Sequence, residues 1–163
     1  MRKLEKKDVQ MFKQIRLEAL EEVPEAFAAS YEEEVDQPHA FFEFKLNEET
    51  CFYGIFDYET LVGIVSLTQS KLLKMNHKAA IGSVYVAKEA RGKGIGKKLL
   101  DHVIKTAHEL GIEQLQLVVA SKNERAKQLY ESLGFHTYGF EERALKVNGE
   151  YIDEDYMMKF LRN

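Results

Sequence analysis

A basic, glycine-rich stretch lies just past the middle of this 163-residue chain: Arg91-Gly92-Lys93-Gly94-Ile95-Gly96. It follows a run of β-branched and aromatic residues over 79–86, which predicts a strand. It precedes a stripe of apolar residues over 95–110, which predicts an amphipathic helix. Glycine lets backbone N–H groups approach a ligand closely, and the N-terminus of a helix carries partial positive charge. The stretch therefore predicts an anion site, and its basic side chains favour a diphosphate.

Two nucleotide-binding motifs do not fit this stretch. The dinucleotide fingerprint G-x-G-x-x-G fails because Gly92, Gly94 and Gly96 are spaced two and two. The P-loop pattern fails because the distance from Gly92 to Gly96 is one residue short and Lys98 replaces the Ser or Thr that holds magnesium. The pattern that remains is Arg-x-x-Gly-x-Gly, which on its own also fits a purely structural turn.

Working outward, the apolar patterns predict a short strand, two helices, three strands, a helix, a strand, a helix and a hairpin, in that order. Helices are expected over 8–21, 38–47, 95–110 and 125–133. Strands are expected over 2–4, 51–56, 61–68, 79–86 and 114–120, with a C-terminal hairpin of 135–147 and 151–161. Asn148-Gly149 between the last two strands predicts a type I′ turn. The strand–helix–strand unit over 79–120 implies one parallel pair in an otherwise mostly antiparallel sheet.

Two helix starts have candidate caps in the sequence. Asp8 is a plausible N-cap of the first helix. Before the last helix, Ser121 and Glu124 have the spacing of a capping box, and Asn123 is the alternative cap.

A second motif follows the glycine-rich stretch after one predicted helix and one predicted strand. It consists of Asn123, Ala126, Leu129, Tyr130, Gly134 and Phe135. Together with Arg91, Gly94 and Gly96, these residues resemble the two signatures of the GCN5-related N-acetyltransferases (GNAT), Gln/Arg-x-x-Gly-x-Gly/Ala and Asn-x-x-Ala-x-x-Leu/Phe-Tyr-x-x-x-Gly-Phe. The resemblance covers about 79–140.

This resemblance implies an α/β (α+β) fold with a central mixed, mostly antiparallel sheet, flanking helices, and one parallel strand pair splayed to admit coenzyme A. It implies acetyl-CoA as co-substrate, with its pyrophosphate on the glycine-rich loop and its pantetheine arm along the preceding strand. The residues implied to bind it are Val84, Tyr85, Val86, Arg91, Gly92, Lys93, Gly94, Ile95, Gly96, Lys97 and Asn123.

Tyr130 is the candidate catalytic residue. A phenol with an ordinary pKa of about 10 can hand a proton to a departing thiolate. Periodicity alone would equally make it a core tyrosine, and Asn123 a plain helix cap. The general base stays unassigned, because the strand before the loop offers no carboxylate over 79–82, and Ser83 and Tyr85 are poor bases.

The segment 22–37 is strongly acidic and contains no lysine or arginine. In the GNAT family the corresponding segment helps to wall the acceptor entrance. We therefore expect Tyr31, Glu33 and Glu34 to bind the acceptor and to favour a basic amine. The alternative is that these glutamates form a solvated helical face.

Composition narrows the remaining possibilities. A net charge of −4 argues against a nucleic-acid-binding protein, and a single cysteine excludes an internal disulfide and a cysteine-rich zinc site, so no metal is expected. Neither a signal peptide nor an apolar run of membrane-spanning length is apparent, which predicts a cytoplasmic protein without a membrane partner.

The family resemblance implies a single N-acetyltransferase domain over 1–163 that transfers an acetyl group directly to a primary amine, and the acidic segment favours a small basic one. A non-catalytic acyl-CoA-binding sensor and a protein N-terminal acetyltransferase are the alternatives. The family resemblance also implies a possible homodimer through the C-terminal strands.

Overall fold

The computed structural model describes residues 1–46 and 49–161, and its centre is a seven-stranded mixed sheet. The strand order is β1-β2-β3-β4-β5-β7-β6, and only β4 and β5 run parallel. The strands are β1 (Arg2–Lys3), β2 (Thr50–Asp57), β3 (Thr60–Gln69), β4 (Lys78–Val86), β5 (Gln114–Ala120), β6 (His136–Val147) and β7 (Glu150–Phe160). The predicted mixed sheet with one parallel pair is thereby confirmed.

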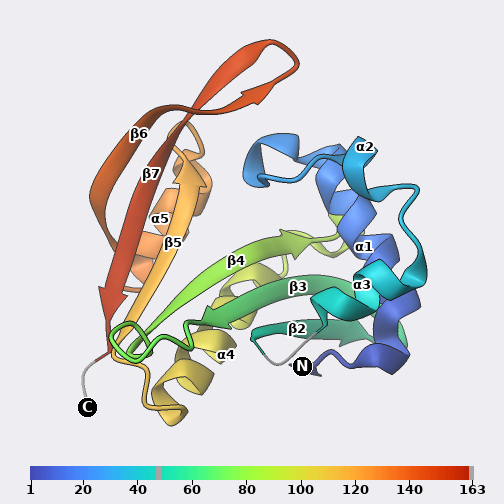
Figure 1. The fold of residues 1–163 in the computed structure, drawn as a ribbon, viewed down its shortest axis with the longest axis horizontal. Helices are drawn as coiled ribbons and strands as arrows, with labels where there is room; N and C mark the ends of the chain where they lie inside the picture. The colour runs from blue at the N-terminus through green and yellow to red at the C-terminus, as the bar shows by residue number, and fades with distance from the viewer. Residues whose placement is uncertain (47–48, 162–163) are drawn as a thin grey trace.

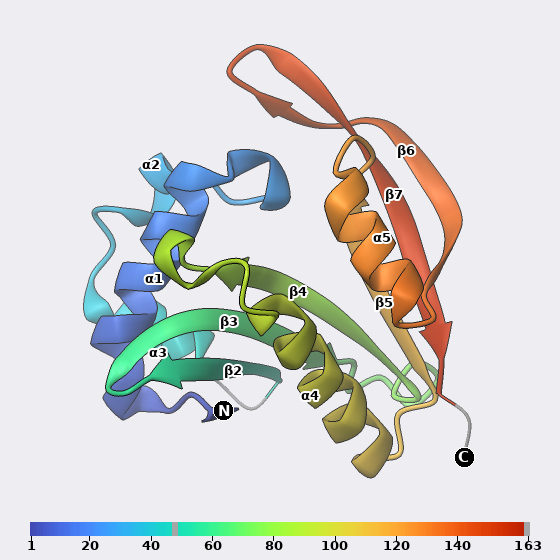
Figure 2. The ribbon, with the colours of Figure 1, turned by 180° about the vertical axis from the view of Figure 1, so that it is seen from behind.

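Helices cover both faces of the sheet. The helices are α1 (Val9–Glu22), α2 (Tyr31–Glu34), α3 (His39–Lys45), α4 (Ile95–Glu109) and α5 (Glu124–Ser132), with single 3₁₀ turns η1 (Lys6–Asp8), η2 (Pro24–Ala26) and η3 (Lys88–Ala90). Figures 1 and 2 show α1, α2 and α3 on one face and α4 and α5 on the other. No helix in the described ranges combines the length and apolarity needed to cross a membrane.

Each face of the sheet has its own apolar core. Phe12, Phe42 and Phe52 belong to the core that lies under α1 and α3. Leu99 and Val103 place the apolar stripe of α4 in the other core. Tyr85 of β4 belongs to the core under α1 and α3, whereas Ile81 of β4 and Leu117 of β5 belong to the core under α4, so β4 is packed on both faces.

The boundaries of the predicted elements hold to within one or two residues, and the N-terminal third contains further short elements that the sequence pattern does not predict. The helix predicted over 38–47 ends at Lys45 in the structure. Position 47, the last of the predicted range, lies outside the described residues. The segment that joins the first two predicted helices contains η2 and α2, which have no apolar periodicity of their own. A reciprocal cap between Ser30 and Glu33 starts α2, which is a local signal too short for periodicity to detect.

The caps and the turn follow local side-chain chemistry. Asn148 and Gly149 both have positive φ, at 50° and 85°, as the predicted type I′ turn requires. Asn123 caps α5, while the hydroxyl of Ser121 donates to Asp155 instead. Asp8 precedes α1, but its carboxylate accepts from Arg2 and from the Glu5 N–H, so it does not cap that helix.

Candidate active site

The parallel strands β4 and β5 are paired only at their first residues. Lys78, Ala79 and Ala80 pair with Gln114, Leu115 and Gln116, and no later residues of the two strands pair. Figure 1 shows the strands diverging beyond this point. A cleft of about 460 Å³ opens there, lined by residues 80–84 of β4, residues 116–120 of β5, α5, η2 and the β6–β7 hairpin. The predicted splay is therefore present in the structure.

A β-bulge in β4 accompanies the divergence. Ile64 of β3 pairs with Tyr85 and Ser66 pairs with Gly82, so Ser83 and Val84 together stand opposite the single residue Val65. Ser83 has a φ of 49°, which is the left-handed region. A bulge bends the strand and leaves backbone groups outside the ladder. Backbone polar groups of β4 are thus available beside the cleft, where Val84 contributes to the lining.

The glycine-rich loop has the backbone shape of an anion cradle. Gly92 and Gly94 have φ values of 76° and 71°, which L side chains rarely adopt. Gly94 is the N-cap of α4, and no side chain caps that helix. A Cβ built on either glycine would meet nothing within 4 Å. The space over the loop is open, and the N-terminus of α4 faces it without a capping group.

Two of the predicted coenzyme A residues point toward α1 rather than over the loop. The guanidinium of Arg91 donates to the Glu22 carboxylate at 2.8 Å and, through Nε, to the Val86 carbonyl at 3.0 Å. The hydroxyl of Tyr85 lies within hydrogen-bond distance of Glu22 and of Glu18. These contacts lower the pKa of Glu22, and they fasten the start of the loop to α1. Lys93 is exposed on the loop, and Lys97 is exposed but forms an ion pair with Asp101 at 2.8 Å.

Tyr130 projects from α5 into the cleft. Its side chain is only 8% exposed and packs edge-on against Phe135. The hydroxyl makes no hydrogen bond to any residue that the structure describes, yet its oxygen is not sealed in the core. Burial raises the pKa of this phenol to about 12. Tyr130 therefore holds its proton at neutral pH and presents it to the cleft.

Asn123 combines a structural contact with a place on the cleft wall. Its Oδ1 accepts the Ala126 N–H at 3.1 Å and starts α5. The residue also lines the cleft. A role as cap is thus shown by the geometry, and a contact with coenzyme A stays a prediction.

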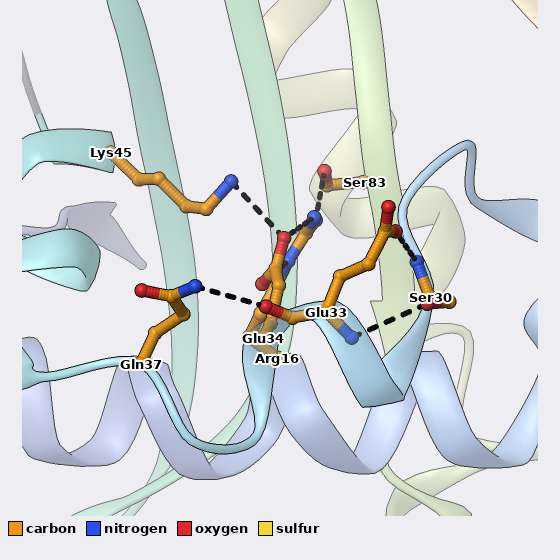
Figure 3. Close-up of polar contacts among 7 residues, drawn as sticks. All are labelled: Arg16, Ser30, Glu33, Glu34, Gln37, Lys45 and Ser83. Carbon is orange, nitrogen blue, oxygen red and sulfur yellow. Dashed lines mark hydrogen bonds and ion pairs between the residues drawn. The ribbon is translucent and has the colours of Figure 1, made fainter.

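The predicted acceptor residues of α2 do not line the cleft. Figure 3 shows Glu34 turned into the protein, where it is 2% exposed. It accepts from Arg16 at 2.8 and 3.0 Å and from Lys45 at 3.1 Å. Burial opposes its ionisation, but these two cations still hold the pKa of Glu34 below its usual value. Arg16 reaches onward to the Ser83 hydroxyl at 3.2 Å, so the network supports the bulge of β4.

The other two predicted acceptor residues serve α2 locally. Glu33 accepts the Ser30 N–H, and its own N–H donates to the Ser30 hydroxyl. Tyr31 is partly buried against the core under α1. An acceptor role for these three residues stays a prediction that no contact supports.

Sequence reasoning missed the side chains that the β6–β7 hairpin contributes to the cleft. They are Tyr138, Glu154 and Tyr156, and η2 adds Glu25. The rings of Tyr138 and Tyr156 meet edge-to-face with centroids 6.1 Å apart. The period-two spacing of Glu154 and Tyr156 places both on one face of β7. That face meets the cleft only because β7 inserts between β5 and β6, which no local pattern reveals.

A larger hollow of about 710 Å³ lies elsewhere, between α1, the β2–β3 turn and η3. None of the predicted site residues lines it. We therefore place the candidate active site in the β4–β5 cleft.

Comparison with known proteins identifies the family of this chain. The model of the Acetyltransferase (GNAT) domain family matches residues 1–156. A thialysine N-ε-acetyltransferase from Bos taurus is 38% identical over 72 residues, which cover 39% of this chain and 42% of that protein. The match thus spans less than half of the length of this curated relative.

Solved structures share the whole fold. An acetyltransferase of the GNAT family from Streptococcus pneumoniae superposes with a TM-score of 0.86 at 24% identity, covering 98% of each chain. A GNAT superfamily phosphinothricin acetyltransferase from Sinorhizobium meliloti, solved in complex with acetyl-CoA, superposes with a TM-score of 0.80 at 21% identity. It covers 98% of this chain and 86% of that chain. Because the family model matches almost the whole chain, the protein belongs to the GNAT acetyltransferase family.

Proposed function

We propose that this protein is an acetyl-CoA-dependent N-acetyltransferase whose single domain over 1–163 moves an acetyl group directly to a primary amine. The observation that carries the proposal is the unpartnered hydroxyl of Tyr130 in the cleft between the splayed strands. Because this oxygen is reachable from the cleft and has no partner among the described residues, it is free to donate its proton to a bound ligand. Family membership supports the reaction class.

The residues present fit acetyl-CoA. The open space over Gly92 and Gly94 and the uncapped start of α4 suit a pyrophosphate. The bulged backbone of β4 near Val84 can hydrogen-bond an extended amide-containing arm in the manner of an added strand. When bound, acetyl-CoA supplies an activated acyl group as a thioester. Tyr130 lines the cleft and keeps its proton at neutral pH, so it can protonate the departing sulfur.

A small basic amine is the acceptor that the cleft favours. Its lining includes the carboxylates of Glu25 and Glu154 and the rings of Tyr138 and Tyr156, and it includes no lysine or arginine among the described residues. Carboxylates attract an ammonium group, and aromatic faces bind cations. These lining residues support the proposal of a basic acceptor, and they are not the α2 residues that the sequence predicted to bind it.

A screen for released thiol tests the proposed function. Acetyl-CoA is incubated with the protein and a panel of diamines, amino acids, amino sugars and a peptide with a free N-terminus. We expect the highest kcat/KM for a small diamine, falling with ionic strength because salt screens the attraction. Activity only toward the peptide would favour the protein N-terminal acetyltransferase. Acetyl-CoA binding with no thiol release for any amine would favour the sensor.

The loop makes a separate prediction about the donor. Gly94→Val puts a β-branched residue at a φ of 71°, which costs about 1–2 kcal/mol in the left-handed region. The loop must shift to relieve this strain, so we expect the Kd for acetyl-CoA to rise about tenfold or more. Isothermal titration calorimetry measures it. Gly149→Val is the matched control, because Gly149 has a φ of 85° in the distant hairpin turn. Equal Kd values for the two variants would show that the loop does not bind acetyl-CoA.

We also propose a homodimer. The strand β6 is one of the two outer strands of the sheet, and among the described residues it pairs with β7 alone. Sedimentation equilibrium measures the mass in solution, and a monomer at all concentrations would contradict this proposal.

A further inference from the structure

Glu154 is a carboxylate in the cleft that the protein leaves unpaired. Its side chain is partly buried and lines the cleft beside Tyr156, on the same face of β7. Across the sheet it stands opposite Ala120 of β5 and Glu141 of β6. The carboxylate of Glu154 forms no hydrogen bond and no ion pair with any residue that the structure describes.

Two acids next to Glu154 in the sheet have partners. Glu141 accepts a hydrogen bond from the hydroxyl of Tyr156. Asp155, on the opposite face of β7, is paired with Lys127 at 2.8 Å and accepts from Ser121 at 2.9 Å. Like charges directly opposite each other on paired strands are destabilising. The pair Glu141 and Glu154 is therefore a cost to folding that a bound cation would offset.

An independent group of the same cleft is also open to a ligand. The hydroxyl of Tyr130, on a side chain 8% exposed, is likewise without a partner and reaches the cleft from α5. The cleft thus contains one unpaired proton donor and one unpaired proton acceptor, contributed by different elements. Acetyl transfer to an ammonium group needs both, since nitrogen must lose protons and sulfur must gain one.

Building on the function proposed above, we infer that Glu154 binds the ammonium group of the acceptor and takes its proton. The freed nitrogen then forms the bond to the acetyl carbon as the carbon–sulfur bond breaks. Tyr130 gives its proton to the sulfur and is reprotonated by the second proton that the nitrogen sheds. One proton ends on the thiol, and the one taken by Glu154 passes to solvent.

The electrostatic surroundings of Glu154 suit a base. Burial, and then the charge of Glu141, raise the pKa of Glu154 above its ordinary value. The other titratable groups of the cleft lining are Tyr138, Tyr156, Tyr130 and Glu25, so no cation of the lining lowers it. A carboxylate with a raised pKa is a stronger proton acceptor once ionised, and it works best when its pKa approaches the operating pH.

The test compares Glu154→Gln with the wild type, using 1,4-diaminobutane and whichever amine of the panel gives the highest wild-type kcat/KM. Glutamine keeps the size and loses the charge and the basicity. We expect kcat/KM at neutral pH to fall ~10²–10⁴-fold, the range for general acid–base assistance, with the Kd for acetyl-CoA unchanged. Glu150→Gln, the same change at an exposed position of β7 outside the cleft, should leave both quantities at the wild-type level.

The pH profile separates a base from a packing residue. Wild-type kcat/KM should fall as pH drops through the raised pKa of Glu154, because the protonated acid neither attracts nor deprotonates the ammonium. Glu154→Gln should lose this limb and regain activity at high pH, where the amine is already neutral. Glu141→Gln removes the charge that raises this pKa, so its acid limb should move to lower pH.

The outcomes distinguish the two proposals. No thiol release by the wild type with any amine overturns the proposed function itself. An active wild type together with an unchanged kcat/KM and pH profile in folded Glu154→Gln overturns the role of Glu154 alone. If Glu154→Gln does not fold, the pH profile of Glu141→Gln decides. An acid limb at the wild-type pH would overturn the role of Glu154, and an acid limb moved to lower pH would support it.

Discussion

Tyr130→Phe is expected to lower kcat by ~10²–10⁴-fold while the Kd for acetyl-CoA stays close to that of the wild type. The phenylalanine ring keeps the edge contact with Phe135 and occupies the same space in the core, so only the hydroxyl that donates the proton is lost. Because the pKa of Tyr130 is raised to about 12, the wild-type phenol is protonated throughout the neutral range. Single-turnover kinetics measure the chemical step, and calorimetry measures the Kd.

The matched control for this prediction is Tyr53→Phe. Tyr53 is as buried as Tyr130, packs against His102, and does not line the cleft. We expect this variant to keep the wild-type kcat. If Tyr130→Phe also keeps it while chemistry is rate-limiting, Tyr130 is a packing residue and the proton reaches the sulfur by another route.

Glu34→Ala is expected to destabilise the fold by about 3–5 kcal/mol, because it leaves the buried guanidinium of Arg16 without its carboxylate. Urea unfolding measures the loss as a lower midpoint. Glu33→Ala, which removes an exposed cap interaction on the same helix, should cost about 0.5–2 kcal/mol. A loss below that of Glu33→Ala would contradict a structural role for the Glu34 network and would return Glu34 to the acceptor role first expected for it.

The same network predicts a pH dependence of stability. The pKa of Glu34 is lowered in the folded protein, so its contribution is complete above the unfolded value of about 4.3 and disappears as pH falls through the lowered folded value. We expect the urea midpoint of the wild type to decrease in this acid range. Glu34→Gln should show a smaller decrease over the same range. Parallel curves for the two proteins would contradict the lowered pKa.

The local signals in the sequence predicted what is local in the structure. The glycine-rich loop, the start of α4 at Ile95 and the turn at Asn148-Gly149 follow from backbone requirements that glycine and asparagine reveal on their own. The cap at Asn123 follows in the same way from a short polar side chain beside an uncapped N–H.

The partners of charged side chains could not be predicted, because they come from distant elements. Arg91 and Glu22 are 69 positions apart in the chain, and their ion pair exists only because α1 lies against the end of β4. Glu34 looked like one more acid in an exposed run, yet a single turn of helix directs it to Arg16. Glu154 belongs to no recognisable motif. It lies at the cleft because β7 pairs beside β5, between β5 and β6.

Mass spectrometry of the amine product tests acetyl transfer in the β4–β5 cleft most directly. The protein is incubated with acetyl-CoA labelled in the acetyl group and with 1,4-diaminobutane or the best amine of the panel. We predict an amine carrying one labelled acetyl group, formed in the same amount as the free thiol by the wild type and slowed strongly in Tyr130→Phe. Thiol release without any acetylated amine, or equal product from both proteins, would contradict transfer to an amine in this cleft.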